Sequence, residues 1–103
     1  MLQKPILRED RLRRVPPGFS WVDHRLVRQG YFLRAEARAW ALYLVLVTVG
    51  DEYGRSYYGD GRLGRLLSLE PQEIAAARGQ LAAAGMIAYE KPFYQVLSLE
   101  DVP

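Results

Sequence analysis

The sequence predicts a mainly helical α+β domain, with three helices followed by a C-terminal β-hairpin. Three observations support this class. Residues 36–49 are almost all apolar with helical spacing, residues 60–84 contain two short helices joined by a tight turn, and residues 86–99 contain two strand-like runs. At 103 residues the chain is long enough for one domain with a modest core.

Residues 1–18 are predicted to be a basic arm, ahead of a domain at residues 19–99 and a tail at residues 100–103. Five basic and two acidic side chains give the arm a surplus of +3. Three prolines and Gly18 argue against one continuous helix there. The arm is either a flexible segment that follows a phosphate backbone or enters a minor groove, or else a solvated tail or a linker that docks on a partner subunit. The residues leave these alternatives open.

Residues 19–34 are predicted to lead into the domain. Residues 19–22 are typical of a short extended segment, and Asp23 of an N-cap for a helical turn over residues 23–29. Residues 31–33 (Tyr-Phe-Leu) are predicted to be a buried connector. His24 is the only histidine and has no acid or nucleophile partner at a recognisable spacing, so we interpret it as a structural or surface residue.

Residues 36–49 predict the longest helix. Trp40 and Tyr43 are interpreted as core anchors. Further apolar residues on the remaining side indicate burial nearly all round. The predicted buried stripe consists of Ala37, Trp40, Ala41, Tyr43, Leu44, Val47 and Thr48.

Residues 60–84 predict a helix-turn-helix. Asp60 is expected to cap a first helix at residues 60–67, and Pro71 occupies the first position of a second helix at residues 71–84. Ile74, Ala77 and Leu81 mark the apolar face of that helix. The second helix of such a motif can lie in a major groove of DNA.

A glycine and a β-hairpin follow. Gly85 is expected to end the helix in the left-handed region. Residues 86–89 and 94–99 predict two strands joined by a turn at residues 90–93, and residues 55–58 predict a further short strand. We expect one core that contains Leu44, Leu66, Ile74, Leu81 and Ile87.

The end of this segment, LAAAGMIAYEKPFYQVLSL, resembles the end of a winged helix DNA-binding domain. There the second helix closes on an L-x-x-A-G-[LM]-I pattern and runs into the hairpin called the wing. Leu81, Ala84, Gly85, Met86 and Ile87 match this pattern, and the resemblance covers residues 35–99. The layout is similar to that of small transcription regulators and of the N-terminal domains of primosomal and plasmid replication initiation proteins. The resemblance implies a winged helix-turn-helix with a three-helix core, in which residues 55–58 pair with the wing.

Double-stranded DNA is therefore the expected partner. Gln72 and Gln80 can pair with adenine edges, and alanines such as Ala76 can touch a thymine methyl group. Glu73 repels phosphate, and Arg78 is the only basic side chain on the second helix. The expected base-facing residues are Gln72, Glu73, Ala76 and Gln80. The expected phosphate contacts are Arg8, Arg11, Arg13, Arg14, Arg55, Arg62, Arg65 and Lys91.

The alternative function is a winged helix used as a protein–protein or dimerisation module without DNA binding, with the alanine-rich helix as a docking face. An enzyme is not expected, because no catalytic constellation or phosphate-binding loop is found. No metal, cofactor or small-molecule ligand is indicated, and the chain has no cysteine. No apolar run is long enough to cross a membrane, so we expect a cytoplasmic protein.

Overall fold

The computed structural model describes residues 3–99; residues 1–2 of the predicted arm and the predicted tail at residues 100–103 lie outside this range. The order of elements confirms a mainly helical α+β fold in a winged-helix-like arrangement. In chain order the elements are the 3₁₀ turn η1 (Glu9–Arg11), α1 (Arg25–Arg28), the 3₁₀ helix η2 (Tyr31–Arg34), α2 (Ala37–Val49), β1 (Arg55–Tyr57), α3 (Asp60–Leu67), α4 (Pro71–Ala83), β2 (Ile87–Glu90) and β3 (Phe93–Val96).

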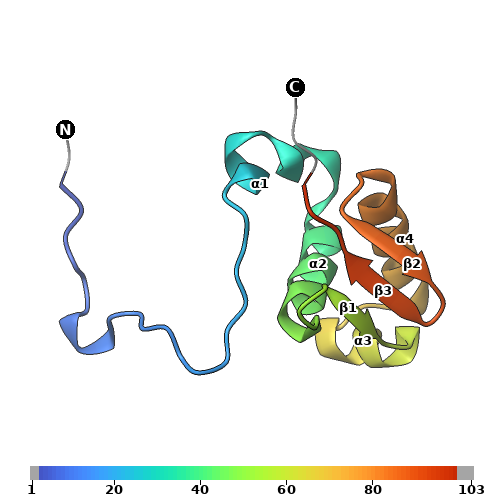
Figure 1. Ribbon diagram of the computed structural model, residues 1–103, viewed down its shortest axis with the longest axis horizontal. Coiled ribbons are helices and arrows are strands. Elements are labelled where there is room, and N and C mark those ends of the chain that lie inside the picture. The colour runs from blue at the N-terminus through green and yellow to red at the C-terminus, as the bar shows by residue number, and fades with distance from the viewer. Residues whose placement is uncertain (1–2, 100–103) are drawn as a thin grey trace.

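The three strands form one antiparallel sheet in the order β1-β3-β2 (Figure 1). β2 and β3 are joined by a hairpin tip of two residues, Lys91 and Pro92. β1 pairs with β3, with Ser56 opposite Tyr94. The predicted hairpin and the pairing of the short strand with it are therefore confirmed. The second hairpin strand is shorter than predicted, because it ends at Val96.

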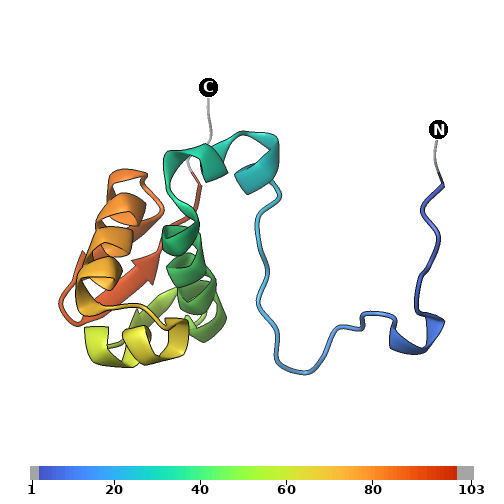
Figure 2. The same ribbon diagram turned by 180° about the vertical axis from the view of Figure 1, so that it is seen from behind.

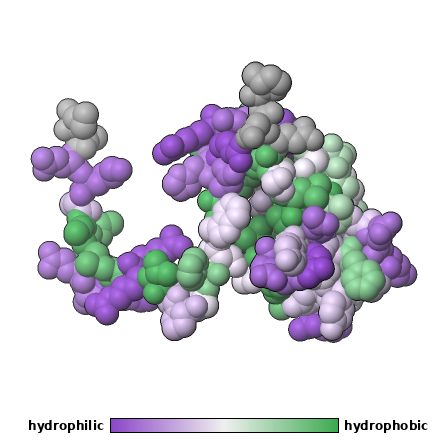
Figure 3. All heavy atoms as spheres, viewed as in Figure 1, coloured by the Kyte–Doolittle hydropathy of each residue, from purple (hydrophilic) through white to green (hydrophobic). Residues whose placement is uncertain are grey.

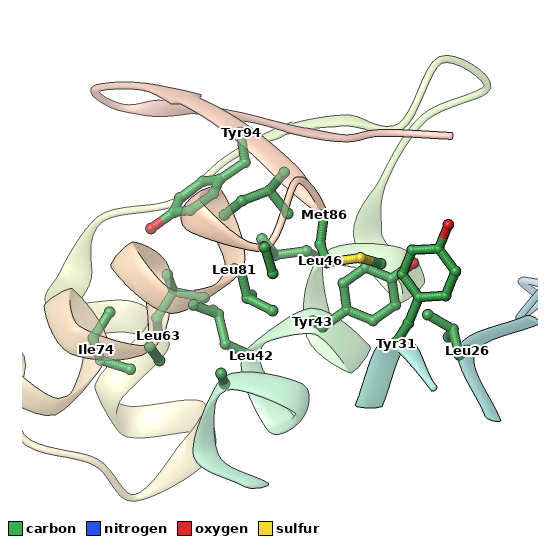
Figure 4. Close-up of a cluster of buried hydrophobic side chains, with 14 of the residues drawn as sticks. Leu26, Tyr31, Leu42, Tyr43, Leu46, Leu63, Ile74, Leu81, Met86 and Tyr94 are labelled. Atoms are coloured by element: carbon green, nitrogen blue, oxygen red, sulfur yellow. The ribbon is translucent and has the colours of Figure 1, made fainter. Parts of the chain in front are cut away.

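Helices cover one face of this sheet. α4 lies behind the sheet in Figure 1 and in front of it in Figure 2, while α3 lies below it in both views. The core forms where α2, α3 and α4 meet the inner face of the sheet (Figure 4). The buried core residues are Leu26, Tyr31, Ala39, Leu42, Tyr43, Leu46, Leu63, Ile74, Ala77, Leu81, Ala84, Met86, Ile87, Tyr94 and Leu99.

Two of the five residues predicted for this core are exposed. Leu44 is 59% exposed and Leu66 is 57% exposed, whereas Ile74, Leu81 and Ile87 are buried as predicted. α3 buries Leu63 in place of Leu66.

The predicted buried stripe of α2 is only partly confirmed. Tyr43 is buried, and Trp40 and Val47 are partly buried against the core, whereas Ala37, Leu44 and Thr48 are exposed. The fully buried side chains of this helix are Ala39, Leu42, Tyr43 and Leu46, which face α4, α3 and β3. α2 is apolar on every side, so its periodicity does not select a face. The contacts of α2 with α4, α3 and β3 determine which of its sides is buried.

α3 begins differently from the prediction. Gly59 is the N-cap, and Asp60 is the first helical residue. The Asp60 carboxylate instead accepts a hydrogen bond from Nη1 of Arg78, at 2.7 Å. The Asp60 side chain therefore forms a long-range ion pair with Arg78 and does not cap the helix.

Both ends of α4 follow local sequence signals. Pro71 is its first residue, and the side chains of Glu70 and Glu73 form a reciprocal capping box. At the other end Gly85 has φ +77°, in the left-handed region. The N–H groups of Met86 and Gly85 donate to the carbonyls of Leu81 and Ala82, which is a Schellman motif. The predicted role of Gly85 is confirmed, and this turn aims the chain into β2.

The segment before α2 is less buried than predicted. The helical turn exists as α1, and Asp23 accepts a hydrogen bond from the Arg25 N–H at 2.9 Å. In η2 only Tyr31 is buried. Phe32 packs against the Trp40 ring but is 41% exposed, and Leu33 is 92% exposed. The expectation of a fully buried connector is wrong, because a 3₁₀ helix aims its side chains in three directions and only one meets the core.

The arm lies away from the domain, and in the structure it continues through residues 19–22, which were predicted to belong to the domain. Residues 3–22 are all exposed, and in Figures 1 and 2 this segment extends outward beyond α2. The radius of gyration is 15.7 Å, larger than the roughly 13 Å of a compact chain of this length. The space-filling view in Figure 3 shows both hydrophobic and hydrophilic side chains along the arm.

Candidate nucleic-acid interface

The outward side of α4 is open to solvent. Ile74, Ala77 and Leu81 face the core, as predicted. The opposite side carries small and neutral side chains and has no element packed over it in the described part of the chain. We call this surface the α4 outer face; it consists of Gln72, Ala75, Ala76, Gly79, Ala82 and Ala83.

Glu73 does not belong to this face. Its Oε1 accepts a hydrogen bond from the Glu70 N–H at 3.0 Å, as part of the capping box. Its other carboxylate oxygen forms an ion pair with Arg38 of α2. Because Arg38 and the helix N-terminus both compensate its charge, Glu73 opposes an approaching phosphate less than the sequence suggests.

Gln80 is also turned toward α2. Its side-chain oxygen accepts from the Glu36 N–H at 2.8 Å, and its Nε2 donates to the Glu36 carboxylate at 3.0 Å. This pair of bonds ties α4 to the N-terminus of α2. Of the four residues expected to face bases, the structure therefore exposes Gln72 and Ala76 and engages Glu73 and Gln80 within the domain.

Arg78 joins three elements. Its guanidinium donates to Asp60 of α3 at 2.7 Å and to the Tyr94 hydroxyl of β3 at 2.9 Å, and it lies over the Tyr89 ring at 4.4 Å. The bond to Asp60 raises the pKa of Arg78 above its ordinary value. The burial of Tyr94 raises the pKa of that phenol. Arg78, the one basic side chain of α4, is therefore engaged in contacts within the domain.

Arg34 caps the C-terminus of α4. The sequence did not indicate this contact. Its Nη1 donates to the Ala84 carbonyl at 3.2 Å, and its guanidinium lies over the Tyr31 ring at 4.3 Å. These residues are 50 positions apart, so no local pattern links them. A cation at this end complements the helix dipole.

Two of the predicted phosphate contacts meet beside β1. Arg55 and Arg62 both line a hollow of about 550 Å³. Arg55 forms an ion pair with Asp51 at 2.9 Å. The Arg62 guanidinium lies 4.4 Å from the centre of the Tyr58 ring and has no carboxylate partner within residues 3–99. The hairpin tip is close by, because the Tyr58 N–H donates to the Pro92 carbonyl at 3.3 Å.

The remaining basic candidates are spread over the molecule. Arg65 is exposed on α3, and Lys91 is exposed at the hairpin tip. The arm arginines Arg8, Arg11, Arg13 and Arg14 lie in the outlying segment, where Arg8 pairs with Asp10 at 2.7 Å. The arm therefore does not converge with α3 and the tip in this conformation.

The positive charge of the chain is concentrated in the arm. Residues 1–22 contain five basic and two acidic side chains, whereas residues 23–103 contain nine basic and ten acidic ones. The net charge of +2 thus combines an arm of +3 with a remainder of −1. Long-range attraction of a polyanion would depend mainly on the arm.

The site has no metal centre in the described residues, since no three His, Cys, Asp or Glu side chains cluster within residues 3–99. Over the same residues, no helix is long and apolar enough to cross a membrane. Comparison of the chain with models of known families, with curated proteins and with solved structures finds no match.

Proposed function

We propose that this domain binds duplex DNA by placing the α4 outer face in a major groove. The observation that supports this most directly is the uncovered surface of α4, which follows α3 and a tight turn and precedes a hairpin. Its small side chains let the helix approach base edges closely, and Gln72 supplies an amide that can pair with adenine. Such a contact would serve either transcription regulation or replication initiation.

Phosphate contacts would come from neighbouring elements. The first helix of a helix-turn-helix crosses the DNA backbone, which assigns that role to Arg62 and Arg65 of α3. Lys91 at the hairpin tip is the corresponding contact of the wing. The arm adds four exposed arginines on a segment that can follow the backbone. These contacts position the domain, and Gln72 and Ala76 select the sequence.

The test is a DNA-binding titration at two salt concentrations. Arg62→Ala with Arg65→Ala should weaken binding to all duplexes alike and reduce the salt slope by about two. Arg28→Ala is the matched control, because Arg28 is an exposed arginine of α1 outside the proposed interface. Absence of duplex binding by the parent chain at low salt would show that the proposal is wrong.

Gln72→Ala provides the complementary test. It should lower the preference for one duplex sequence and leave the salt slope unchanged, because it removes a base contact and no charge. Gln80→Ala is a useful contrast. We expect it to lower the stability of the domain, since Gln80 bonds to Glu36. Equal loss of binding to all sequences by Gln72→Ala would contradict its role as a base reader.

A second candidate function, a protein-interaction module, is favoured by the composition of the arm. Its large apolar side chains are exposed, and a partner surface could cover them. Light scattering on the full chain would detect self-association, and Trp21→Ser should disrupt it while Gln72→Ala should not. The exposed apolar residues of the arm are Ile6, Leu7, Leu12, Val15, Phe19, Trp21 and Val22.

A further inference from the structure

The outer face of the sheet carries an aromatic pair at its β1 side. Tyr57 of β1 lies opposite Phe93 of β3 in the register, so both side chains point to the same face. Their rings meet edge to face, with centroids 6.3 Å apart. Tyr57 is 70% exposed and Phe93 is 61% exposed, and no helix covers this face in Figure 1. The pair is therefore open to a ligand.

Cationic and polar groups border this pair. Arg55, Arg62, Tyr57 and Phe93 all line the hollow of about 550 Å³ beside β1. The Arg62 guanidinium is held over Tyr58, so it is positioned without being neutralised by a carboxylate in the described structure. Asp51 also lines the hollow, but its carboxylate is occupied by Arg55 and by the N–H groups of Arg55 and Tyr53.

Two groups in this region lack partners. Ser56 lines the same hollow, and its Oγ is buried without a hydrogen-bond partner in residues 3–99. β1 is an edge strand of the sheet. On its free edge, Asp51 bonds only to the backbone N–H and carbonyl of Arg55. The N–H of Tyr57 points to the open edge, because Gly54 and Tyr58 make the bonds to the hairpin. The Tyr57 N–H is therefore the group that a ligand in the hollow can reach, because the Ser56 Oγ lies on the core side of β1 and is enclosed by the protein.

We propose that the hollow beside β1 is a binding site for single-stranded nucleic acid. Stacking on an aromatic side chain needs a base whose face is open, which a duplex hides and a single strand offers. One base would stack on Tyr57 and Phe93, and a neighbouring phosphate would contact Arg62. The Tyr57 N–H would bond to the base or the phosphate. Glu90 is exposed on the same face, opposite Phe93, so a strand would keep to the β1 side.

The aromatic pair of this site is separate from the α4 outer face, although Arg62 belongs to both proposed contacts. In the register, Tyr57 and Phe93 lie on the opposite face of the sheet from the buried Tyr94. The helices lie on the other side of the sheet (Figures 1 and 2). Neither aromatic residue belongs to the core. Variants of the aromatic pair and of Gln72 can therefore test the two sites independently, whereas Arg62→Ala affects both.

The experiment measures anisotropy of a labelled oligothymidylate on the full chain at low salt. Tyr57→Ala with Phe93→Ala should weaken binding by about tenfold or more. Tyr53→Ala is the matched control, because Tyr53 is 64% exposed on the neighbouring turn and does not line the hollow. Arg62→Ala should weaken binding and lower the salt slope by about one, and it provides a second variant if the double variant folds poorly.

A duplex of the same length distinguishes this proposal from the proposed function. The double aromatic variant should bind that duplex as the parent does, and Gln72→Ala should bind the oligothymidylate as the parent does. If the parent binds the duplex but not the oligothymidylate, the single-strand site is wrong and the α4 contact stands. Equal loss in Tyr53→Ala and in the double variant would also overturn it.

Discussion

The arm and the domain differ in the burial of their apolar residues. In residues 3–22 seven large apolar side chains are each at least half exposed, whereas residues 23–99 bury a continuous core. In the arm the apolar residues follow neither a helical nor a strand period, and prolines interrupt them. In α4 they recur at Ile74, Ala77 and Leu81 on one face. The comparison of α4 with the arm shows that apolar residues build a core where their spacing places them on one face, and that apolar content alone does not.

The largest expected effect compares two leucines. Leu81→Ala should lower the free energy of unfolding by about 2–5 kcal/mol, because it leaves a cavity in the core. Leu12→Ala in the arm should leave it unchanged, since Leu12 is exposed. Chemical denaturation of both variants checks the contrast. A destabilised Leu12→Ala would mean that the arm packs on the domain in solution.

The second comparison concerns two ion pairs. Arg78→Ala should cost about 1–2 kcal/mol, because it removes bonds to Asp60 and Tyr94 from a side chain that is only 16% exposed. Arg8→Ala also breaks an ion pair, with Asp10, but in the exposed arm, so thermal unfolding should not change. Equal effects of the two changes would contradict the assignment of Arg78 as the link between α3, α4 and β3.

Two glycines provide the third comparison. Gly85→Ala should cost about 1 kcal/mol, because φ is +77° and an added Cβ would meet no atom within 4 Å, so the penalty is conformational alone. Gly18→Ala should be neutral, because Gly18 has no positive φ and no neighbour. Differential scanning calorimetry can resolve the two. A neutral Gly85→Ala would mean that α4 does not end at this residue.

The smallest effect is on pH dependence. Hydrogen bonds, first from the Arg55 N–H, lower the pKa of Asp51. Asp51 therefore stabilises the domain at neutral pH. This contribution begins to fall near the ordinary carboxyl pKa of about 4 and is lost as pH falls further, through the lowered pKa of Asp51 in the folded protein. The unfolding temperature of Asp51→Asn should fall less on acidification than that of the parent.

Asp10 is the matched control for that measurement. The neighbouring Arg8 lowers the pKa of Asp10 as well. However, the two residues are two positions apart in an exposed arm, so the same contact can form in the unfolded chain. Asp10→Asn should therefore follow the parent over the whole pH range.

Local signals in the sequence predicted the elements well. Pro71 and Gly85 mark the two ends of α4, and the helix begins and ends within one residue of the prediction. α3 has the predicted bounds, although Asp60 does not cap it. These features depend on residues that are close in the sequence and that set the local backbone conformation.

Long-range contacts could not be predicted in the same way. The exposed Leu44 of α2 could not be told from its buried neighbours, because every face of that helix is apolar. Gln80 was expected to face a base, but its partner Glu36 is 44 residues away. The meeting of Arg55 and Arg62 beside β1 likewise depends on how the strand and α3 are placed.

The capping box of α4 has a consequence for the electrostatics of DNA recognition. The N-terminus of a helix normally attracts anions through its free N–H groups and its dipole. In α4 the Glu70 and Glu73 carboxylates already accept from the capping-box N–H groups, and Pro71 has none to offer. The partial positive charge of this helix end is therefore compensated within the protein. The attraction that this part of α4 exerts on a polyanion must therefore come from neighbouring arginine and lysine side chains, which salt can screen.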